Sequence, residues 1–199
     1  VAILTFDQNK FEHTYNKLTA EASFREIFLE VFVPLLHKLG LEWQSQSINP
    51  AHEHFISNLI KQKLLINIEK VHNSGIRESD KTYVLFLPEN EIHEFGLLYL
   101  HYELLLKGNY SVFLGASVPM SSLKSVRENF KHVHYISYFT VKPAKEDVAS
   151  YLHAFSDELL AKEGDAFWLT GRNTQGAPPI KTPGKVKIFS DLRALLKEI

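Results

Sequence analysis

A histidine at position 93 follows Glu91 by two residues and precedes Gly96 by three. Imidazole is a common metal ligand, and a carboxylate that accepts the proton of its other ring nitrogen fixes the tautomer and raises the basicity. Gly96 has no side chain, so a bulky ligand could approach the backbone closely there. The spacing therefore predicts a metal ligand, His93, that is held by Glu91. A solvated loop histidine with a glycine kept for packing is the alternative that the same residues allow.

The elements around His93 are expected to place it where open α/β sheets bind ligands. Residues 83–87 form a short apolar run that Pro88 ends, which is typical of a strand buried on both faces. Residues 94–107 carry leucines at helical spacing, and Gly108 supplies a stop signal. His93 is therefore predicted to lie in a strand-to-helix turn at the carboxyl edge of a parallel sheet.

The C-terminal part of the chain, residues 79–199, alternates between predicted strands and helices. Its expected strands cover residues 83–87, 111–114, 133–137, 166–169 and 186–189. Alternation of this kind predicts a parallel sheet covered by helices on both faces. We therefore expect a flavodoxin-like (Rossmann-type) α/β domain, with its ligand crevice beyond the carboxyl ends of the strands.

The N-terminal part, residues 1–78, shows helical periodicity and no convincing strand. A helix is expected over residues 22–38, with a kink or break at Pro34 and a stop at Gly40. Asn49-Pro50 opens the next helix, as N-cap and first-turn proline. This part is predicted to be an all-α helical bundle.

Composition bounds the classes of function. The chain has 199 residues, 45% of them hydrophobic, a net charge of −1 and no cysteine. Disulfides and thiolate metal sites are therefore excluded, and no basic run indicates a nucleic-acid surface. We expect a cytoplasmic protein with no membrane segment, because neither a signal peptide nor a long apolar run is present. The start at Val1 suggests a piece of a longer chain.

The motif around His93 resembles that of a known family. Glu91-x-His93-x-x-Gly96 resembles the Asp-x-His-x-x-Gly signature of cobalamin-binding domains, with Glu91 in place of the usual aspartate. The resemblance implies that His93 is the lower axial ligand to cobalt, where it displaces the benzimidazole base of the cofactor itself.

Two further segments resemble the same family in the expected order. Ser137-Tyr138-Phe139 resembles its Ser-x-Leu element, and Thr170-Gly171 matches half of its Gly-Gly element. The resemblance implies that the nucleotide tail of the cofactor enters the sheet past Gly96, Ser137 and Gly171.

A second constellation lies in the helical part. Trp43, Glu53 and His54 resemble the Trp-x9-Glu-His signature of cobalamin-binding transcriptional regulators of the MerR type. The resemblance implies that Trp43 packs over the upper face of the cofactor, beside the adenosyl group, and that Glu53 and His54 border that pocket. An indole offers a flat apolar surface, and a carboxylate accepts hydrogen bonds from ribose or adenine. Taken alone, Trp43 would be a core or interface anchor, and the other two would be solvated first-turn residues.

Together these resemblances imply the cobalamin-binding sensor region of a transcriptional regulator, with adenosylcobalamin as ligand and no enzyme activity of its own. The resemblance further implies a light-responsive photoreceptor that forms homo-oligomers and releases DNA in light. We expect its N-terminal DNA-binding domain to lie outside this chain. Gln44 departs from the light-sensing relatives, in which the histidine after the tryptophan ligates cobalt once light has removed the adenosyl group.

Two alternatives come from other classes of protein. A corrinoid carrier for a methyltransferase also joins a helical bundle to a cobalamin-binding sheet, and a preference for methylcobalamin would favour it. A ligand-free flavodoxin-like interaction module, such as a receiver domain, is the other. A receiver needs a phosphoacceptor aspartate after its third strand, and Tyr138-Phe139-Thr140 offers none.

Overall fold

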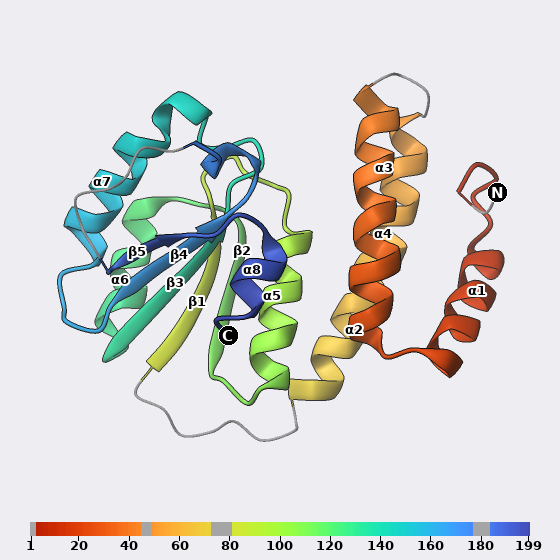
Figure 1. The fold of residues 1–199 in the computed structure, drawn as a ribbon, viewed down its shortest axis with the longest axis horizontal. Helices are drawn as coiled ribbons and strands as arrows, with labels where there is room; N and C mark the ends of the chain where they lie inside the picture. Colours follow the sequence, from red (N-terminus) through yellow and green to blue (C-terminus); the bar gives the residue numbers. More distant parts are fainter. Residues whose placement is uncertain (1–2, 45–48, 73–80, 177–183) are drawn as a thin grey trace. The chain divides into compact units, whose positions relative to one another are not determined.

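A computed structural model of the chain describes residues 3–44, 49–72, 81–176 and 184–199 (Figure 1). The chain divides into two compact units, Val1–Asn67 and Ile68–Ile199. The boundary predicted between residues 78 and 79 lies outside the described residues. Among the described helices, none combines the length and the apolar character that crossing a membrane requires.

Unit 1 is helical, as predicted. Its elements are α1 (Gln8–Glu21), α2 (Phe24–Ile27), the π-helical segment η1 (Phe28–Phe32), α3 (Val33–Gln44) and the first part of α4 (Pro50–His72). The cap of α4 is the predicted one, because the Asn49 side chain accepts from the Ala51 N–H at 2.8 Å. α4 continues past Asn67 into unit 2.

The helix expected over residues 22–38 is interrupted near Pro34, as predicted, but it does not end at Gly40. The break lies in the turn before Pro34, where η1 hydrogen-bonds in the π pattern. Pro34 has no N–H for the usual ladder, and π turns are a common way to absorb such a gap. The stop predicted at Gly40 is wrong, because α3 continues to Gln44. Glycine inside a helix costs only about 1 kcal/mol, and buried Leu39 packs beside it.

Aromatic residues dominate the core of unit 1. Phe11 of α1 stacks on Phe32 of η1 with ring centroids 6.4 Å apart, and Lys63 of α4 pairs with Glu12 of α1 at 2.6 Å. The buried apolar residues of this unit are Phe11, Phe24, Ile27, Phe28, Phe32, Leu39, Ile56, Leu59, Ile60 and Leu64. Each described helix therefore contributes an apolar face to one core.

Unit 2 is the predicted parallel sheet. Its strands are β1 (Lys81–Pro88), β2 (Ser111–Val118), β3 (His132–Tyr138), β4 (Ala166–Thr170) and β5 (Val186–Ile188), in the order β2-β1-β3-β4-β5. Every pairing is parallel, and each predicted strand is confirmed. This order is the flavodoxin-like one, whose switch point lies between β1 and β3.

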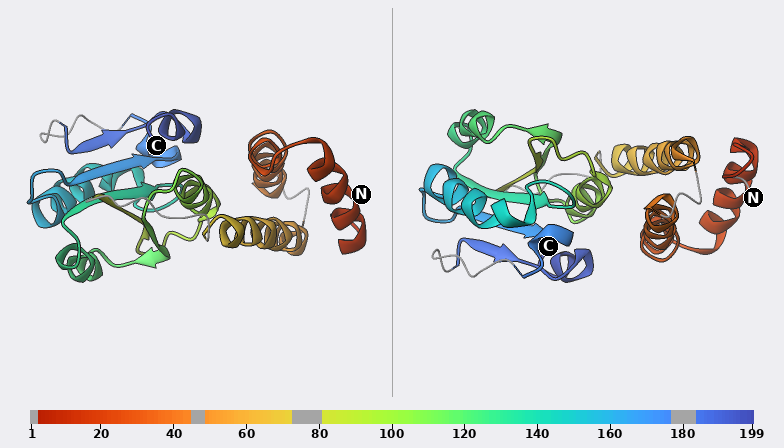
Figure 2. Two further views of the ribbon diagram at one scale, coloured as in Figure 1. Left: turned by 90° about the horizontal axis from the view of Figure 1, so that it is seen from below. Right: turned by 90° about the horizontal axis from the view of Figure 1, so that it is seen from above.

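Helices cover both faces of this sheet (Figure 2). α5 (Phe95–Leu106) and α8 (Leu192–Leu196) lie on one face, and α6 (Leu123–Glu128) and α7 (Val148–Leu159) lie on the other. Under α7, Phe155 stacks on Phe167 of β4 with ring centroids 4.0 Å apart. Both rings are fully buried, so the sheet is a rigid base for the connections at its carboxyl edge.

Candidate functional site

His93 lies in the connection between β1 and α5, at the carboxyl edge of the sheet, as predicted. Its Nδ1 donates to Oε1 of Glu91 at 2.5 Å. The His93 side chain is 51% exposed, whereas that of Glu91 is fully buried. The hydrogen bond predicted between the two residues is therefore present, and a metal ligated by this imidazole would be bound through its other ring nitrogen, Nε2.

The buried carboxylate of Glu91 accepts three hydrogen bonds at each oxygen. Oε1 accepts from the backbone N–H groups of Ile92 at 2.9 Å and His93 at 3.0 Å, in addition to the imidazole. Oε2 accepts from three successive N–H groups of the connection after β3, those of residues 140, 141 and 142, at 3.1, 2.5 and 2.8 Å. One side chain therefore ties the loop of His93 to the loop that follows β3.

These hydrogen bonds set the charge of Glu91. Burial alone raises the pKa of the carboxyl, but the hydrogen bonds from His93, Lys142 and Val141 outweigh it and lower the pKa from 4.5 to about 2. Glu91 is therefore ionised at neutral pH, and its charge holds the proton on Nδ1 of His93.

The end of β2 supports the same loop from the other side. The Ser117 N–H donates to the Glu91 carbonyl at 3.1 Å, and its hydroxyl accepts from the Asn90 N–H at 3.0 Å. Ser117 and Asn90 both have positive φ, 55° and 64°. The loop of His93 is thus anchored to the sheet by backbone groups on both sides of Glu91.

Gly96 lies at the start of α5, under the ring of Tyr138. A Cβ at this position would lie 2.6 Å from Cε2 of Tyr138. The absence of a side chain here therefore admits an aromatic ring of the chain itself, and a ligand that approached Gly96 would have to displace Tyr138. The sequence motif did not single out Tyr138.

Ser137 and Gly171 are both engaged in packing within the sheet. The Ser137 hydroxyl is buried and donates to the Phe86 carbonyl at 2.8 Å. Gly171 has a φ of 123°, and a Cβ there would lie 2.4 Å from the Phe139 carbonyl oxygen. These two residues thus hold the ends of β3 and β4 against their neighbours.

The second constellation lies on helices of unit 1. Trp43 lies in the last turn of α3, because α3 extends past Gly40. Its side chain is outside the described part of the structure. Glu53 accepts from the Ser57 hydroxyl at 2.5 Å and lies 3.4 Å from Nδ1 of His54, whose side chain is 74% exposed.

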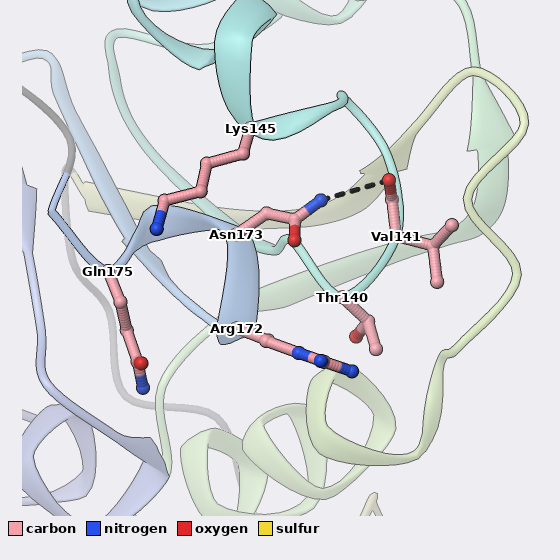
Figure 3. A pocket seen from close by; sticks show the side chains of 6 residues that line it. All are labelled: Thr140, Val141, Lys145, Arg172, Asn173 and Gln175. Carbon is pink, nitrogen blue, oxygen red and sulfur yellow. Dashed lines mark hydrogen bonds between the residues drawn. The ribbon is translucent and has the colours of Figure 1, made fainter. Parts of the chain in front are cut away.

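A pocket that sequence reasoning missed opens beside the Glu91 loop. Its volume is about 450 Å³, and its lining residues are Thr140, Val141, Lys145, Arg172, Asn173 and Gln175 (Figure 3). They follow the ends of β3 and β4. The signal that could have found them is their position, because the carboxyl ends of neighbouring parallel strands share one edge.

At this edge one side chain, that of His93, could ligate a metal whose other ligands belong to a larger cofactor. His93 presents a half-exposed imidazole whose other nitrogen is engaged by a buried carboxylate. Over the described residues, no group of three or more histidine, aspartate or glutamate side chains could hold a metal ion by itself. A metal at His93 would therefore have to bring its other ligands with it.

Parts of this chain are similar to known proteins. Residues 1–66 match the family model of the B12 binding domain. The HTH-type transcriptional repressor CarH of Myxococcus xanthus is 28% identical over 122 residues, which cover 61% of this chain and 40% of the repressor. The chain thus spans about two fifths of the length of this relative.

Two solved structures are similar to this chain to different degrees. The monomethylamine corrinoid protein of Methanosarcina barkeri aligns with a TM-score of 0.70 at 12% identity, over 92% of this chain and 86% of that one. A cobalamin-binding protein of Desulfitobacterium hafniense aligns with a TM-score of 0.43 at 15% identity, over 99% and 93%. The first likeness confirms the Rossmann-like fold.

Taken together, the family match and the repressor support a cobalamin-binding region. They indicate a binding or carrier module and not an enzyme.

Replacement of Glu91 tests the buried carboxylate. The folded pKa of about 2 lies below the ordinary 4.5, so the stabilisation is complete above pH 4.5 and is lost as the pH falls towards 2. We expect Glu91→Gln to lower the free energy of unfolding by about 3 kcal/mol at neutral pH. Urea unfolding followed by circular dichroism, repeated at decreasing pH, should show the difference from the unmutated protein shrinking below pH 4.5.

Glu89→Gln is the matched control, because Glu89 is exposed in the same loop. Its free energy of unfolding should stay within about 0.5 kcal/mol of the unmutated value at every pH. A loss in Glu91→Gln that did not vary with pH would contradict the role given to the ionised carboxylate.

Replacement of Gly171 tests the packing at the end of β4. In Gly171→Ala the new methyl group would meet the Phe139 backbone at 2.4 Å, so we expect the free energy of unfolding to fall by more than about 3 kcal/mol. Gly176 also has positive φ, 77°, but open space around it. Gly176→Ala should cost only the conformational strain of about 1 kcal/mol. Equal losses in urea unfolding of the two variants would mean that the close approach to Phe139 has no role.

Proposed function

We propose that this chain is the cobalamin-binding sensor region of a transcriptional regulator, and that its ligand is adenosylcobalamin. The observation that carries the proposal is the half-exposed imidazole of His93, held through Nδ1 by the buried, ionised Glu91 at the carboxyl edge of the sheet. The match of residues 1–66 to the B12 binding domain and the likeness to a repressor support it.

In this proposal His93 ligates cobalt from below through Nε2. Glu91 keeps the proton on Nδ1 and so keeps the ligating nitrogen basic. Gly96, Ser137 and Gly171 line the proposed path of the nucleotide tail. The ring of Tyr138 lies over Gly96, so we propose that Tyr138 moves when the tail enters.

The upper face of the cofactor is assigned to the helical part of the chain. By the resemblance, Trp43 packs on the adenosyl group, while Glu53 and His54 border it. Glu53 has one carboxylate oxygen bonded to Ser57 and the other near His54, and carboxylate oxygens accept hydrogen bonds from ribose hydroxyls. The helical part would thereby respond to whether an adenosyl group is present.

The proposed output is a change of assembly. A ligand that binds one assembly state better shifts the population towards that state. We propose that the cofactor-bound chain forms a homo-oligomer and that DNA is bound through a domain outside this sequence. Light is a further candidate signal, because light breaks the cobalt–carbon bond of adenosylcobalamin. Gln44 lacks the imidazole that the light-sensing relatives place there.

Axial ligation by His93 can be measured directly. We expect His93→Ala to weaken adenosylcobalamin binding at least tenfold in spectrophotometric titration, because the protein then supplies no nitrogen ligand. With cob(II)alamin as the probe, labelling of the protein histidines with ¹⁵N should change the nitrogen splitting in the electron paramagnetic resonance spectrum. The exposed His153 of α7 provides the control variant, His153→Ala, which should bind as the unmutated chain does. An unchanged splitting would exclude His93 as the ligand.

The upper ligand of the cobalamin that the chain prefers distinguishes a sensor region from a corrinoid carrier. We expect at least tenfold tighter binding of adenosylcobalamin than of methylcobalamin, and loss of this preference in Trp43→Ala. Gel filtration with adenosylcobalamin in the dark should show an oligomer, and the same sample after green illumination tests light as the signal. A preference for methylcobalamin without any change of size would favour a corrinoid carrier for a methyltransferase.

A further inference from the structure

We infer that the pocket between the connections after β3 and β4 binds a phosphate group. Arg172 and Lys145 supply two positive charges to it, and none of its six lining residues carries a carboxylate. Both side chains are exposed, and within the described part of the chain neither forms an ion pair. The six residues that line the pocket therefore bring two positive charges and no negative charge to it.

The lining residues come from the two connections after β3 and β4 and lie around one residue, Asn173. In Figure 3, Lys145 of η3 (Lys145–Asp147) extends to the same side of Asn173 as Gln175, whereas Arg172 of η4 (Arg172–Thr174) extends towards Thr140. The two cations thus stand on opposite sides of the pocket. A ligand between them can receive charge-assisted hydrogen bonds at two points.

The pocket can hold the organic part of a phosphate ester in addition to the phosphate itself. A guanidinium matches the oxygens of a phosphate bidentately, and the amide of Gln175 and the hydroxyl of Thr140 can donate to further oxygens. A volume of about 450 Å³ lies in the range of pockets for small organic molecules. The exposed side chain of Val141 offers an apolar surface for the organic part.

Asn173 holds the wall of the pocket in place. Its Nδ2 donates to the carbonyl oxygens of Val141 and Pro143, each at 2.9 Å. Both amide hydrogens are therefore used in hydrogen bonds to the wall of the pocket and not to a ligand. The N–H groups of residues 140–142 point to the other side and donate to Glu91. The same segment therefore borders the pocket and restrains the carboxylate that holds His93.

Two sources could supply the phosphate. One is a free phosphate ester, and the other is the phosphodiester in the nucleotide loop of cobalamin itself. The second source rests on the proposed function, whereas the first does not. Cobinamide, which lacks the nucleotide loop, separates them, because it keeps the cobalt and the corrin ring but not the phosphodiester.

The test uses the full chain and the variants Arg172→Ala and Lys145→Ala. Isothermal titration with inorganic phosphate, without any corrinoid, should show binding that weakens about tenfold in each variant and in raised salt. Parallel titrations with cobalamin and with cobinamide measure the ratio of the two affinities. Arg172→Lys retains the charge and should recover part of the affinity, and Lys162→Ala, an exposed lysine before β4 at the opposite edge of the sheet, is the control.

The titrations distinguish a free phosphate ester from the phosphodiester of cobalamin. Binding of inorganic phosphate that both variants weaken supports a site for free phosphate esters. If inorganic phosphate does not bind, but both variants weaken cobalamin and leave cobinamide unchanged, the phosphodiester is the ligand. The inference is overturned if neither probe distinguishes the variants from Lys162→Ala. Binding of phosphate by a chain that binds no corrinoid would separate this inference from the proposed function, which would then fail alone.

Discussion

The carboxyl edge of the sheet depends on one buried charge. An ionised carboxylate removed from water must be compensated by hydrogen bonds, or burial would neutralise it. Glu91 meets that demand with donors from its own loop and from the loop after β3. The compensation is therefore also a geometric restraint, because the two loops can satisfy the charge only when they lie together.

The restraint extends beyond Glu91 through successive connections. Asn173, after β4, holds the segment that donates to Glu91, and Ser117, at the end of β2, holds the Glu91 backbone. The carboxyl ends of four neighbouring strands are thus linked to Glu91, either directly or through the segment after β3. A parallel sheet makes this possible because its strands all end at the same edge.

Sequence periodicity predicted the secondary structure of unit 2 well, since short apolar runs between helical segments leave few alternatives. It predicted His93 and its hydrogen bond with Glu91, because both residues lie in one short turn. It missed Tyr138 over Gly96 and the pocket around Arg172, which depend on contacts between loops far apart in the sequence. The stop predicted at Gly40 was wrong because the intrinsic cost of a helical glycine is small compared with the burial of Leu39 in the same helix.

The restraint on Glu91 also determines how His93 can respond to its surroundings. With a pKa of about 2, Glu91 remains a carboxylate throughout the physiological range, so the partner of Nδ1 does not change with pH. A proton and a metal ion then compete for Nε2 alone. The buried carboxylate therefore fixes the orientation of the imidazole and the position of its Nδ1 proton over the whole physiological range.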